Sequence, residues 1–427
     1  MSSKTSRPAK IARAAGTGAS APVECCQICG HAPLNAALSL GYMPPVNQMV
    51  PIGQAPRQQP WFPTTLLHCR RCELVQLGIA VDPVIIFPPE YPYTSGTTKL
   101  LRDNFAELQR ESAAMLGLGT QDLVVDIGSN DGTLLSNFVS GGQRVLGIEP
   151  TDVGDIANQR GIPTLKRYFG IEVAREVKRA HGAASVVTAA NCFAHIEDVH
   201  AIVDGIVEML KPDGVFISES HYLISLLDTL QYDTVYHEHL RYYSLTSLKH
   251  LLEMHDLEVF HARPIPSHGG SIRVYAARRG TRPVQDSVAR MLAAEPRGEA
   301  MTERLDAFRH DVVLSKLRLL AMLRELKEND ARIAGISAPS RASTLVNYVG
   351  LDEGLIDYVC EIAGSLKIGK YMPGTQIPVV DEARLFSDQP DCAIIFSWHI
   401  ADELAPKLKA KGFRGQLITP LPVPRLL

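Results

Sequence analysis

The chain has 427 residues, with 43 basic and 46 acidic side chains, a formal charge of -3, 45% hydrophobic residues and 21% charged residues. This length exceeds what one hydrophobic core usually supports, so we expect two or three domains. The balanced charge argues against a nucleic-acid partner, and no run of about 18 apolar residues or secretory signal indicates a membrane partner or an export route. We expect a cytoplasmic protein, and we favour a monomer although the sequence does not decide the oligomeric state.

The start of the chain, residues 1–21, is mostly Ser, Ala, Gly, Thr, Lys and Arg and shows no apolar periodicity. Such a segment cannot recover its ordering entropy by burying apolar surface. We therefore expect a flexible tail.

Two CxxC pairs follow, Cys26-Gln-Ile-Cys29 and Cys69-Arg-Arg-Cys72. Each pair can present two thiolates to one tetrahedral ion, and four protein ligands leave no position for water or substrate. The pattern predicts a structural Zn²⁺ that clamps a zinc-binding module over 22–90. The alternative, two disulfides or unrelated thiols, is disfavoured in a reducing compartment. The adjacent Cys25 is an ambiguous neighbour, and prolines crowding the loop between the pairs argue against helix there.

A buried parallel strand breaking into a glycine turn is predicted at Leu123-Val-Val-Asp-Ile-Gly-Ser-Asn-Asp-Gly132. A helix leads in over 97–115, and another follows at 133–140. A second strand, 144–149, ends in Glu149, whose carboxylate can accept hydrogen bonds from both ribose hydroxyls of an adenosine.

The spacing of this turn distinguishes two cofactors. The pattern Asp126-x-Gly128-x-x-x-Gly132 is typical of methyltransferases, whereas Asn130 breaks the GxGxxG spacing of nicotinamide sites. We therefore expect S-adenosyl-L-methionine. A third strand, 185–191, ends at Asn191, a further expected cofactor neighbour at the carboxyl edge of the sheet. The expected cofactor contacts are Asp126, Gly128, Asn130, Gly132, Glu149 and Asn191.

The α/β alternation then continues. We expect a helix at 197–210, a turn at 211–214, a strand at 215–219, a helix at 246–255 and strands at 257–263 and 271–278, which complete a sheet with an antiparallel edge. These elements define a methyltransferase domain over 91–283.

The loop 232–244, Tyr-Asp-Thr-Val-Tyr-His-Glu-His-Leu-Arg-Tyr-Tyr-Ser, is dense in titratable and aromatic groups. A histidine can accept a proton, a carboxylate can orient it, and a tyrosine hydroxyl can donate to a developing oxyanion. The alternative for such a composition is a solvated loop whose rings cap the sheet.

Taken together, these motifs resemble the zinc-containing sugar C-methyltransferases that act on nucleotide-linked 4-keto-6-deoxyhexoses. The resemblance covers nearly all residues after the tail. It rests on the CxxC pairs, Tyr91-Pro-Tyr-Thr-Ser95, Asp126-Ile-Gly-Ser-Asn-Asp-Gly132, Ala190-Asn-Cys-Phe-Ala-His195, Tyr236-His-Glu-His239 and Ser267-His-Gly-Gly270.

The resemblance implies an α/β protein of three parts: an N-terminal zinc-binding module, a central class I methyltransferase (Rossmann-like) domain, and a C-terminal Rossmann-like α/β domain that helps to hold a sugar nucleotide. Carried over by position, His239 is the general base, and the substrate is surrounded by Tyr236, Glu238, His195 and Tyr93. Further implied substrate contacts are Tyr222, His268, Gly270 and Arg341. The implied partner is a nucleotide-linked keto-deoxysugar, methylated at C3 or C5.

Two departures from the family pattern stand out. Where the family motif commonly reads Tyr-Asp-Glu-His, this chain has His237, a second titratable ring beside the proposed base. The usual Gly-x-Gly-Ala-x-x-Lys pattern appears as Gly335-Ile-Ser-Ala-Pro-Ser-Arg341, so that an arginine replaces a lysine. Arg341 could pair a phosphate bidentately, and the alternative is a bare structural corner between strand and helix.

The C-terminal half begins with helix formers over 284–330, which we expect to connect two domains. From 331 to 427 the strand-turn-helix pattern restarts, with strands near 333–337, 358–361 and 393–396 and helices near 343–348 and 401–411. Lys367 and Lys370 are expected in a solvated loop rather than at the ligand.

Two other functions remain open at this level. The same histidine could deprotonate a hydroxyl or an amine in an O- or N-methyltransferase of another small metabolite. The chain could also be a non-catalytic module that holds partners through its zinc-binding and terminal domains. The intact glycine turn and the residues of the 232–244 loop favour an enzyme over this last reading.

Overall fold

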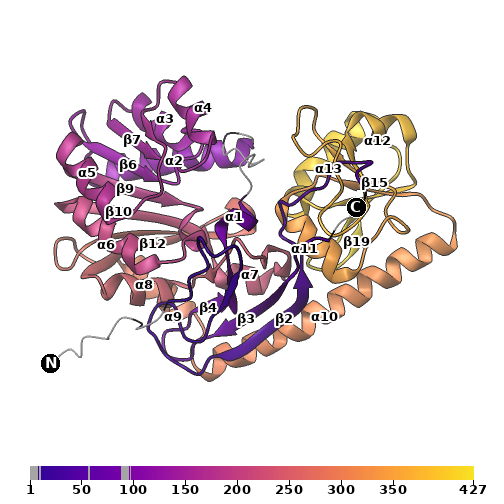
Figure 1. Ribbon diagram of the computed structural model, residues 1–427, viewed down its shortest axis with the longest axis horizontal. Helices are drawn as coiled ribbons and strands as arrows, with labels where there is room; N and C mark the ends of the chain where they lie inside the picture. Colours follow the sequence, from indigo (N-terminus) through magenta and orange to yellow (C-terminus); the bar gives the residue numbers. More distant parts are fainter. Residues whose placement is uncertain (1–7, 9–10, 56–57, 88–95, 97) are drawn as a thin grey trace.

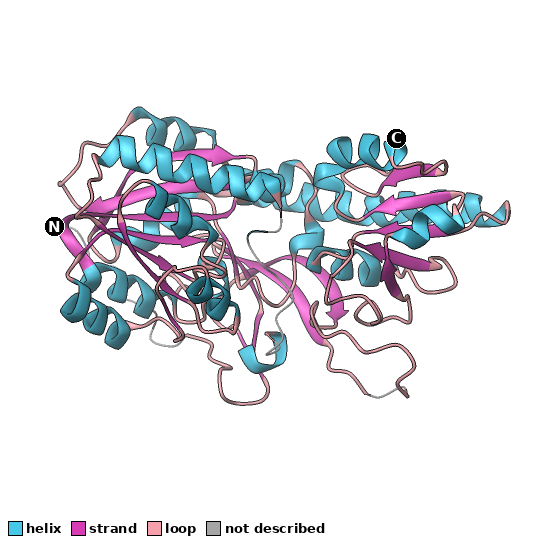
Figure 2. Cartoon of the chain, turned by 90° about the horizontal axis from the view of Figure 1, so that it is seen from above, coloured by secondary structure: helices cyan, strands magenta, loops and turns pink. Residues whose placement is uncertain are grey.

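The computed structural model describes residues 8, 11–55, 58–87, 96 and 98–427. Figures 1 and 2 show a central and a C-terminal α/β unit at opposite ends of the molecule, with the sheet of the N-terminal unit between them. The long helix α10 (Glu299–Glu328) runs beneath the N-terminal sheet and reaches the C-terminal unit (Figure 1).

The central unit is a seven-stranded sheet in the order β12-β13-β10-β9-β6-β7-β8. The predicted antiparallel edge needs a correction. The antiparallel strand β13 lies one position inside the sheet, between β10 and β12, and the edge strand β12 runs with the parallel strands. The strands are β6 (Leu123–Ile127), β7 (Arg144–Ile148), β8 (Thr164–Leu165), β9 (Ala184–Ala190), β10 (Leu210–His221), β12 (Leu257–Ile265) and β13 (Ser271–Arg278).

Helices cover both faces of this sheet. Leu101, Phe105 and Phe138 pack α2 and α3 on one face, and Val177, Val203 and Leu251 pack α5, α6 and α8 on the other. Helix α3 keeps its predicted bounds because Gly132 and Gly141 flank it. The helices are α2 (Lys99–Leu116), α3 (Thr133–Ser140), α4 (Val153–Gln159), α5 (Ile171–His181), α6 (Val199–Met209), α7 (Leu223–Asp228) and α8 (Leu245–Glu253), with the short η2 (Phe193–His195), η3 (Tyr232–Thr234) and η4 (Ser267–Gly269).

The N-terminal unit contains a four-stranded sheet in the order β11-β4-β3-β2. One of these strands, β11 (Arg241–Tyr242), comes from the central part of the chain and pairs with β4. This pairing brings the end of the 232–244 loop against the N-terminal unit. The other strands are β2 (Asn35–Met43), β3 (Phe62–His68) and β4 (Val75–Leu77), followed by helix α1 (Pro83–Ile86).

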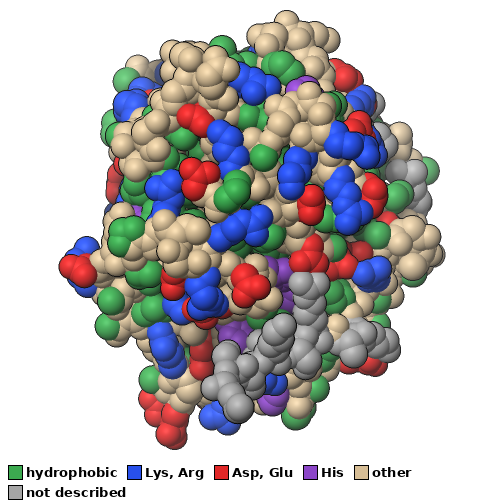
Figure 3. Space-filling view, turned by 90° about the vertical axis from the view of Figure 1, so that its left-hand side faces the viewer, with side chains coloured by type: hydrophobic (Ala, Val, Ile, Leu, Met, Phe, Trp, Pro, Cys, Tyr) green, Lys and Arg blue, Asp and Glu red, His purple; other side chains and the backbone are tan. Residues whose placement is uncertain are grey.

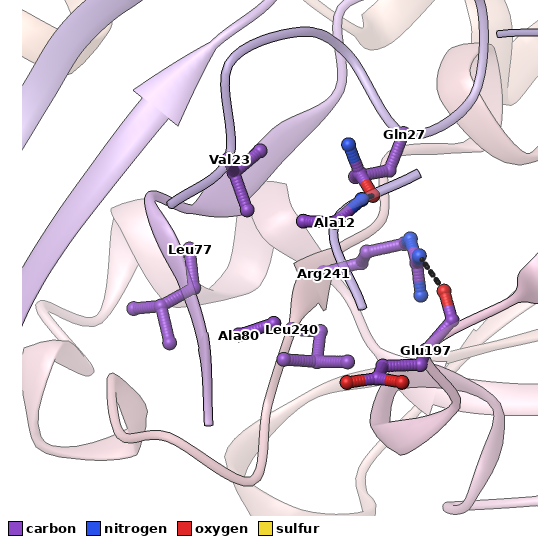
Figure 4. Close-up of a pocket in the computed structure, with 8 residues that line it drawn as sticks. All are labelled: Ala12, Val23, Gln27, Leu77, Ala80, Glu197, Leu240 and Arg241. Atoms are coloured by element: carbon purple, nitrogen blue, oxygen red, sulfur yellow. Dashed lines mark hydrogen bonds between the residues drawn. The ribbon is translucent and has the colours of Figure 1, made fainter. Parts of the chain in front are cut away.

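The expectation of a flexible tail does not describe residues 11–21. Strand β1 (Ser20–Pro22) pairs with β5 (Ile79–Val81), and Ala14 is fully buried. The backbone amide of Ala14 donates to the Glu197 carboxylate at 2.7 Å. Figure 4 shows Ala12 and Gln27 beside Arg241, which donates to the Glu197 carbonyl, around a small cavity. Backbone pairing and polar contacts order this segment, and a search for apolar periodicity detects neither.

The C-terminal unit is a six-stranded sheet in the order β16-β15-β14-β17-β18-β19, parallel except for β19. Helix α9 (Asp286–Ala294) and α10 connect it to the central unit. The strands are β14 (Ile333–Ile336), β15 (Tyr358–Glu361), β16 (Val379–Asp381), β17 (Cys392–Ile395), β18 (Gln416–Thr419) and β19 (Arg425–Leu426), and the helices are α11 (Ser340–Val349), α12 (Ala383–Asp388), η5 (Trp398–Ile400) and α13 (Ala401–Ala410).

One hydrophobic core joins the N-terminal sheet to the C-terminal unit. Leu38, Leu66, Leu226, Leu319 and Leu345, from β2, β3, α7, α10 and α11, belong to a single buried cluster. The units are therefore packed together rather than strung on linkers.

The surface carries charges of both signs. On the face shown in Figure 3, basic and acidic side chains alternate without forming a patch of one sign. Among the helices that the structure describes, none has the length and apolarity to cross a bilayer.

Candidate active site

The four predicted metal ligands come together. The sulfur atoms of Cys26, Cys29, Cys69 and Cys72 all lie within 4.8 Å of one another, and all four side chains are buried. The Sγ atoms of Cys26 and Cys72 are 3.4 Å apart, and those of Cys29 and Cys69 are 3.6 Å apart. A tetrahedral Zn²⁺ with Zn–S bonds of about 2.3 Å requires similar spacings. Cys25 lies outside this cluster.

The chemistry of this donor set also fits a cation. The neighbouring thiols of Cys29 and Cys69, together with burial, raise the pKa of Cys26. Four thiolates at this spacing would repel one another, so a positive ion is what would hold all four sulfurs in that form. Zn²⁺ would be bound by the four cysteines and would cross-link the two CxxC loops. With all four positions filled by protein, it would not act on substrate.

The glycine turn of the central unit is shaped by close contacts. Gly128 has a φ of +69°, and a Cβ there would lie 2.8 Å from the Cβ of Cys192. Gly132 has a φ of +75° and precedes α3. Both predicted glycines therefore occupy left-handed backbone positions at the carboxyl edge of the sheet, where such sheets bind nucleotides.

Two buried acids lie under this turn. Glu149 accepts hydrogen bonds from the amides of Asn130 at 3.0 Å and Thr151 at 2.9 Å. Asp126 accepts one from the Thr188 hydroxyl at 2.6 Å. Burial and the nearby Glu149 and Glu219 raise the pKa of Asp126 to about 7.

Unpartnered polar atoms show where a ligand fits. Neither polar atom of the Asn191 side chain has a hydrogen-bond partner among the described residues, and the same holds for Ser129 Oγ in the glycine turn. Asn191 also adopts a φ of 60°. Buried polar atoms without partners are costly and cluster at binding sites. These residues fit S-adenosyl-L-methionine, whose ribose Glu149 would bind and whose amino-acid end the turn and Asn191 would hold.

His239 is buried, and its orientation is set by one hydrogen bond. Its Nδ1 lies 2.8 Å from the carbonyl oxygen of Thr234. Since a carbonyl can only accept, Nδ1 carries the hydrogen and Nε2 keeps its lone pair in the neutral ring. Burial and the neighbouring His195 hold the pKa of His239 well below its usual range. The ring is therefore a neutral base with a defined accepting nitrogen.

Other rings surround His239. The ring centroid of Tyr236 is 4.2 Å from that of His239, and the centroids of His195 and His221 are each 5.0 Å away. His195 also stacks on Phe87. Burial lowers the pKa of His195 to about 4, so this ring is neutral as well.

Glu238 and His237 point away from this group, toward the N-terminal unit. The Glu238 carboxylate accepts a hydrogen bond from Asn47 at 2.6 Å. His237 Nε2 lies 3.2 Å from the Thr64 hydroxyl, and its ring packs edge-on against Phe62. Burial lowers the pKa of His237 to about 4. The His237 ring is therefore turned away from the group of rings around His239.

Two of the four expected substrate contacts are engaged elsewhere. Arg341 forms a bidentate pair with Asp233, through Nε and Nη2 at 2.7 Å each, and stacks on Trp398. Two guanidinium nitrogens that could pair a phosphate bidentately are therefore bonded to Asp233 instead. The Tyr222 hydroxyl donates to Glu295 at 2.9 Å, a carboxylate that also accepts from the first amides of α8. Tyr222 thus supports the start of α8.

The other two expected contacts, His268 and Gly270, lie beside the imidazole group. The His268 ring centroid is 5.7 Å from that of His221, and its Nε2 has no partner among the described residues. Gly270 has a φ of +123°, and a Cβ there would lie 2.5 Å from the Cβ of Ser225. Tyr93 falls outside the described residues.

Several site residues were missed by the sequence analysis. His221 lies at the end of β10, which runs two residues beyond the predicted strand. Asp233 and Trp398 meet at Arg341, where Trp398 Nε1 donates to Asp233 at 2.7 Å. Lys367 is not in a solvated loop, because its amine donates to the Ala338 carbonyl beside the 335–341 turn. Applying the strand-end rule to β10 would have identified His221.

Comparison with known proteins agrees with this architecture. Three family models match the chain, described as "Putative zinc binding domain" over 26–87, "Methyltransferase domain" over 99–262 and "C-methyltransferase C-terminal domain" over 266–422. The C-methyltransferase NovU of Streptomyces niveus is 34% identical over 412 residues, which is 95% of this chain and 97% of that protein.

Solved structures match less than half of the chain. An S-adenosylmethionine-dependent methyltransferase from Clostridium acetobutylicum is 11% identical, with a TM-score of 0.33 over 43% of this chain and 94% of that chain. One from Anabaena variabilis is 16% identical, with a TM-score of 0.33 over 43% and 86%. Likeness at this level adds no argument, whereas the family models and the full-length relative do. The chain belongs to the C-methyltransferase family and is an S-adenosyl-L-methionine-dependent methyltransferase.

Proposed function

We propose that this enzyme methylates the carbon next to the keto group of a nucleotide-linked 4-keto-6-deoxysugar, at C3 or C5, in deoxysugar biosynthesis. The observation that carries the proposal is the geometry of His239, a buried neutral imidazole with its Nδ1 anchored on the Thr234 carbonyl and its Nε2 free to accept. Such a base suits a C–H bond acidified by an adjacent carbonyl.

The proposed chemistry begins with proton transfer. His239 Nε2 takes the proton from the α-carbon, the C–H bond breaks, and its electron pair moves onto the carbonyl oxygen to give an enolate. The Tyr236 hydroxyl or a His195 N–H donates a hydrogen bond to that oxygen. Bound S-adenosyl-L-methionine would supply the methyl group that the enolate carbon takes up.

The surroundings of the base support this sequence of events. The side chains of His195, His239 and Tyr236 are all more than half buried and lie against one another, so that little water competes for the enolate oxygen. His268 and Gly270 are proposed to border the sugar. The nucleotide is proposed to lie at the boundary with the C-terminal unit, near the 335–341 turn.

A labelling experiment tests the proposal. The enzyme is incubated in deuterated water with a panel of dTDP-, GDP-, UDP- and CDP-linked 4-keto-6-deoxysugars, with and without S-adenosyl-L-methionine. We expect deuterium at the α-carbon in the absence of the methyl donor and a new C–C-bonded methyl group in its presence. Methyl transfer to oxygen or nitrogen, or to substrates without a ketone, would instead establish the O- or N-methyltransferase alternative.

A further inference from the structure

His221 lies beside the proposed base and has no part in the chemistry proposed above. It is the last residue of β10 and lies opposite Ser271 of β13. Strands β9 and β10 are parallel, so the carboxyl end of β10 meets the same sheet edge as Asn191 and His195. Unlike Tyr222, whose hydroxyl is bonded to Glu295, His221 faces other imidazoles.

His239, His221 and His268 form a row of three imidazoles. The ring centroids of His239 and His221 are 5.0 Å apart, and those of His221 and His268 are 5.7 Å apart. Elsewhere in the molecule, His200 and His255 also have centroids 5.0 Å apart, and their ring nitrogens are hydrogen-bonded at 2.8 Å. The centroid spacings in the row are therefore comparable with that of a hydrogen-bonded imidazole pair.

The backbone fixes the far end of the row. His268 adopts a φ of 56°, and Gly270 packs against Ser225 at a φ of +123°. The Gln231 side chain donates to the Gly269 carbonyl at 2.6 Å. Left-handed residues held this firmly cost free energy and are found where a side chain must be aimed. The position of His268 beside His221 is thus imposed by the fold.

The two rings that follow His239 in the row are uncharged in the resting site. Burial keeps the pKa of His268 low, at about 4, and that of His221 well below its usual range, so both rings are neutral at rest. Arg341, a cation that also lowers the pKa of both rings, is paired with Asp233. A neutral imidazole in contact with the base can accept its proton, whereas an imidazolium could not.

We infer that His221 receives from His239 the proton that His239 has taken from the substrate. This inference rests on the proposed function. The α-C–H bond breaks and an N–H bond forms at His239 Nε2. That N–H bond then breaks as an N–H bond forms on His221, which restores the neutral base. The proton then leaves to solvent through His268.

The transfer has a consequence that can be measured. Without His221, the proton stays on His239 and returns to the same carbon, so that α-deuterium exchange with solvent slows. A single round of methyl transfer needs only the first proton abstraction and is largely retained. A purely structural role for His221 would instead slow exchange and methylation together, because both need the same aligned base.

The test compares two rates in His221→Gln and wild type. One is α-deuterium exchange in deuterated water with S-adenosylhomocysteine bound, and the other is single-turnover methyl transfer with S-adenosyl-L-methionine. We expect exchange to fall about tenfold or more, as for loss of a proton-transfer group, and single-turnover methylation to stay within about twofold. An unchanged ratio of the two rates would overturn the inference.

Two further variants guard against trivial outcomes. His221→Ala, with imidazole added, should regain exchange as the imidazole concentration rises, and absence of rescue would count against the transfer. His310→Gln, on an exposed part of α10, controls for replacement of a histidine and should leave both rates unchanged. If wild type itself neither exchanges nor methylates any keto sugar, the proposed function fails first, and the inference fails with it.

Discussion

The central and C-terminal units share one local layout. In the central unit, β6, a turn, α3 and β7 lead to Glu149, which accepts a hydrogen bond from the Asn130 amide at 3.0 Å. In the C-terminal unit, β14, a turn, α11 and β15 lead to Glu361, which accepts one from the Ala338 amide at 2.6 Å. In both units an acid at the end of the second strand accepts a hydrogen bond from the turn that follows the first strand.

The polar groups around the two turns differ in whether they have hydrogen-bond partners. In the central unit, Ser129 Oγ and the Asn191 amide have no partner among the described residues. In the C-terminal unit, the Ser337 hydroxyl lies 2.5 Å from that of Ser397, and Arg341 is committed to Asp233. Equal topology therefore does not give equal sites. Near the central turn, polar groups without partners in the described part of the chain are available to a ligand. At the C-terminal turn, Arg341 instead joins the C-terminal unit to Asp233 of the central part of the chain.

Replacement of the proposed base, His239, should have the largest effect on activity. His239→Ala should lower α-deuterium exchange and methyl transfer by about 10²–10⁴-fold, since it removes the group proposed to take the proton from the substrate carbon. The measurements are exchange with S-adenosylhomocysteine bound and methyl transfer with S-adenosyl-L-methionine at saturation. The control is His237→Gln, because that ring is turned toward Thr64. A larger loss in His237→Gln than in His239→Ala would reverse the assignment.

The second test concerns the joint between the two units. Arg341→Met should cost about 3–5 kcal/mol of unfolding free energy, since it leaves Asp233 buried without its cation. The measurement is urea unfolding of the full chain. Adding Asp233→Asn should recover part of the loss, because Trp398 Nε1 can still donate to the amide oxygen. If Arg341→Met raised KM for the sugar nucleotide and left stability unchanged, Arg341 would be a phosphate ligand after all.

The contrast between the turns also shows what the sequence could reveal. Gly128, Gly132 and the helix between glycines are local signals, so α3 was predicted to the residue. The CxxC pairs were equally readable because ligand spacing is local. The partners of Arg341 could not be read from the sequence. Asp233 and Trp398 lie 108 and 57 positions away from it and are brought together only by packing.

Other errors have equally definite causes. His221 was missed because strand β10 continues past the expected end at Glu219, as it pairs with β13 from Val215 to His221. The order of residues 11–21 was missed because it depends on strand pairing with β5 and on the Glu197 carboxylate. Long-range pairing of a polar segment leaves no periodic signal in its own sequence.

Adding a methyl group to each of two glycines should have a smaller effect. Gly128→Ala places a Cβ 2.8 Å from Cys192 in the central turn, whereas Gly350→Ala, at the end of α11 with a φ of +85°, meets nothing within 4 Å. Gly350→Ala should cost only the left-handed strain of about 1–2 kcal/mol. Gly128→Ala should cost more in thermal unfolding and also weaken S-adenosylhomocysteine binding by about tenfold, or about 1.4 kcal/mol. Equal binding by both variants would contradict a cofactor role for the central turn.

The smallest expected effect is in the pH dependence of kcat/KM. A solvent-exposed imidazole, with a pKa of about 6.5, is half protonated at pH 6.5, so a reaction that needs the neutral base would lose about half its rate there. The pKa of His239 lies well below that value because of burial and the neighbouring His195. Protonation therefore begins only as the pH falls further, and kcat/KM should change by less than about twofold between pH 8 and pH 6.5. A descending limb centred at pH 6.5 or above would mean that the proposed base, His239, is not shielded from solvent by the central unit. The same pH profile measured on His195→Gln gives a second check. Because His195 lowers the pKa of His239, its removal should raise that pKa and move the descending limb to higher pH. The limb should not pass the pKa of an exposed histidine, about 6.5.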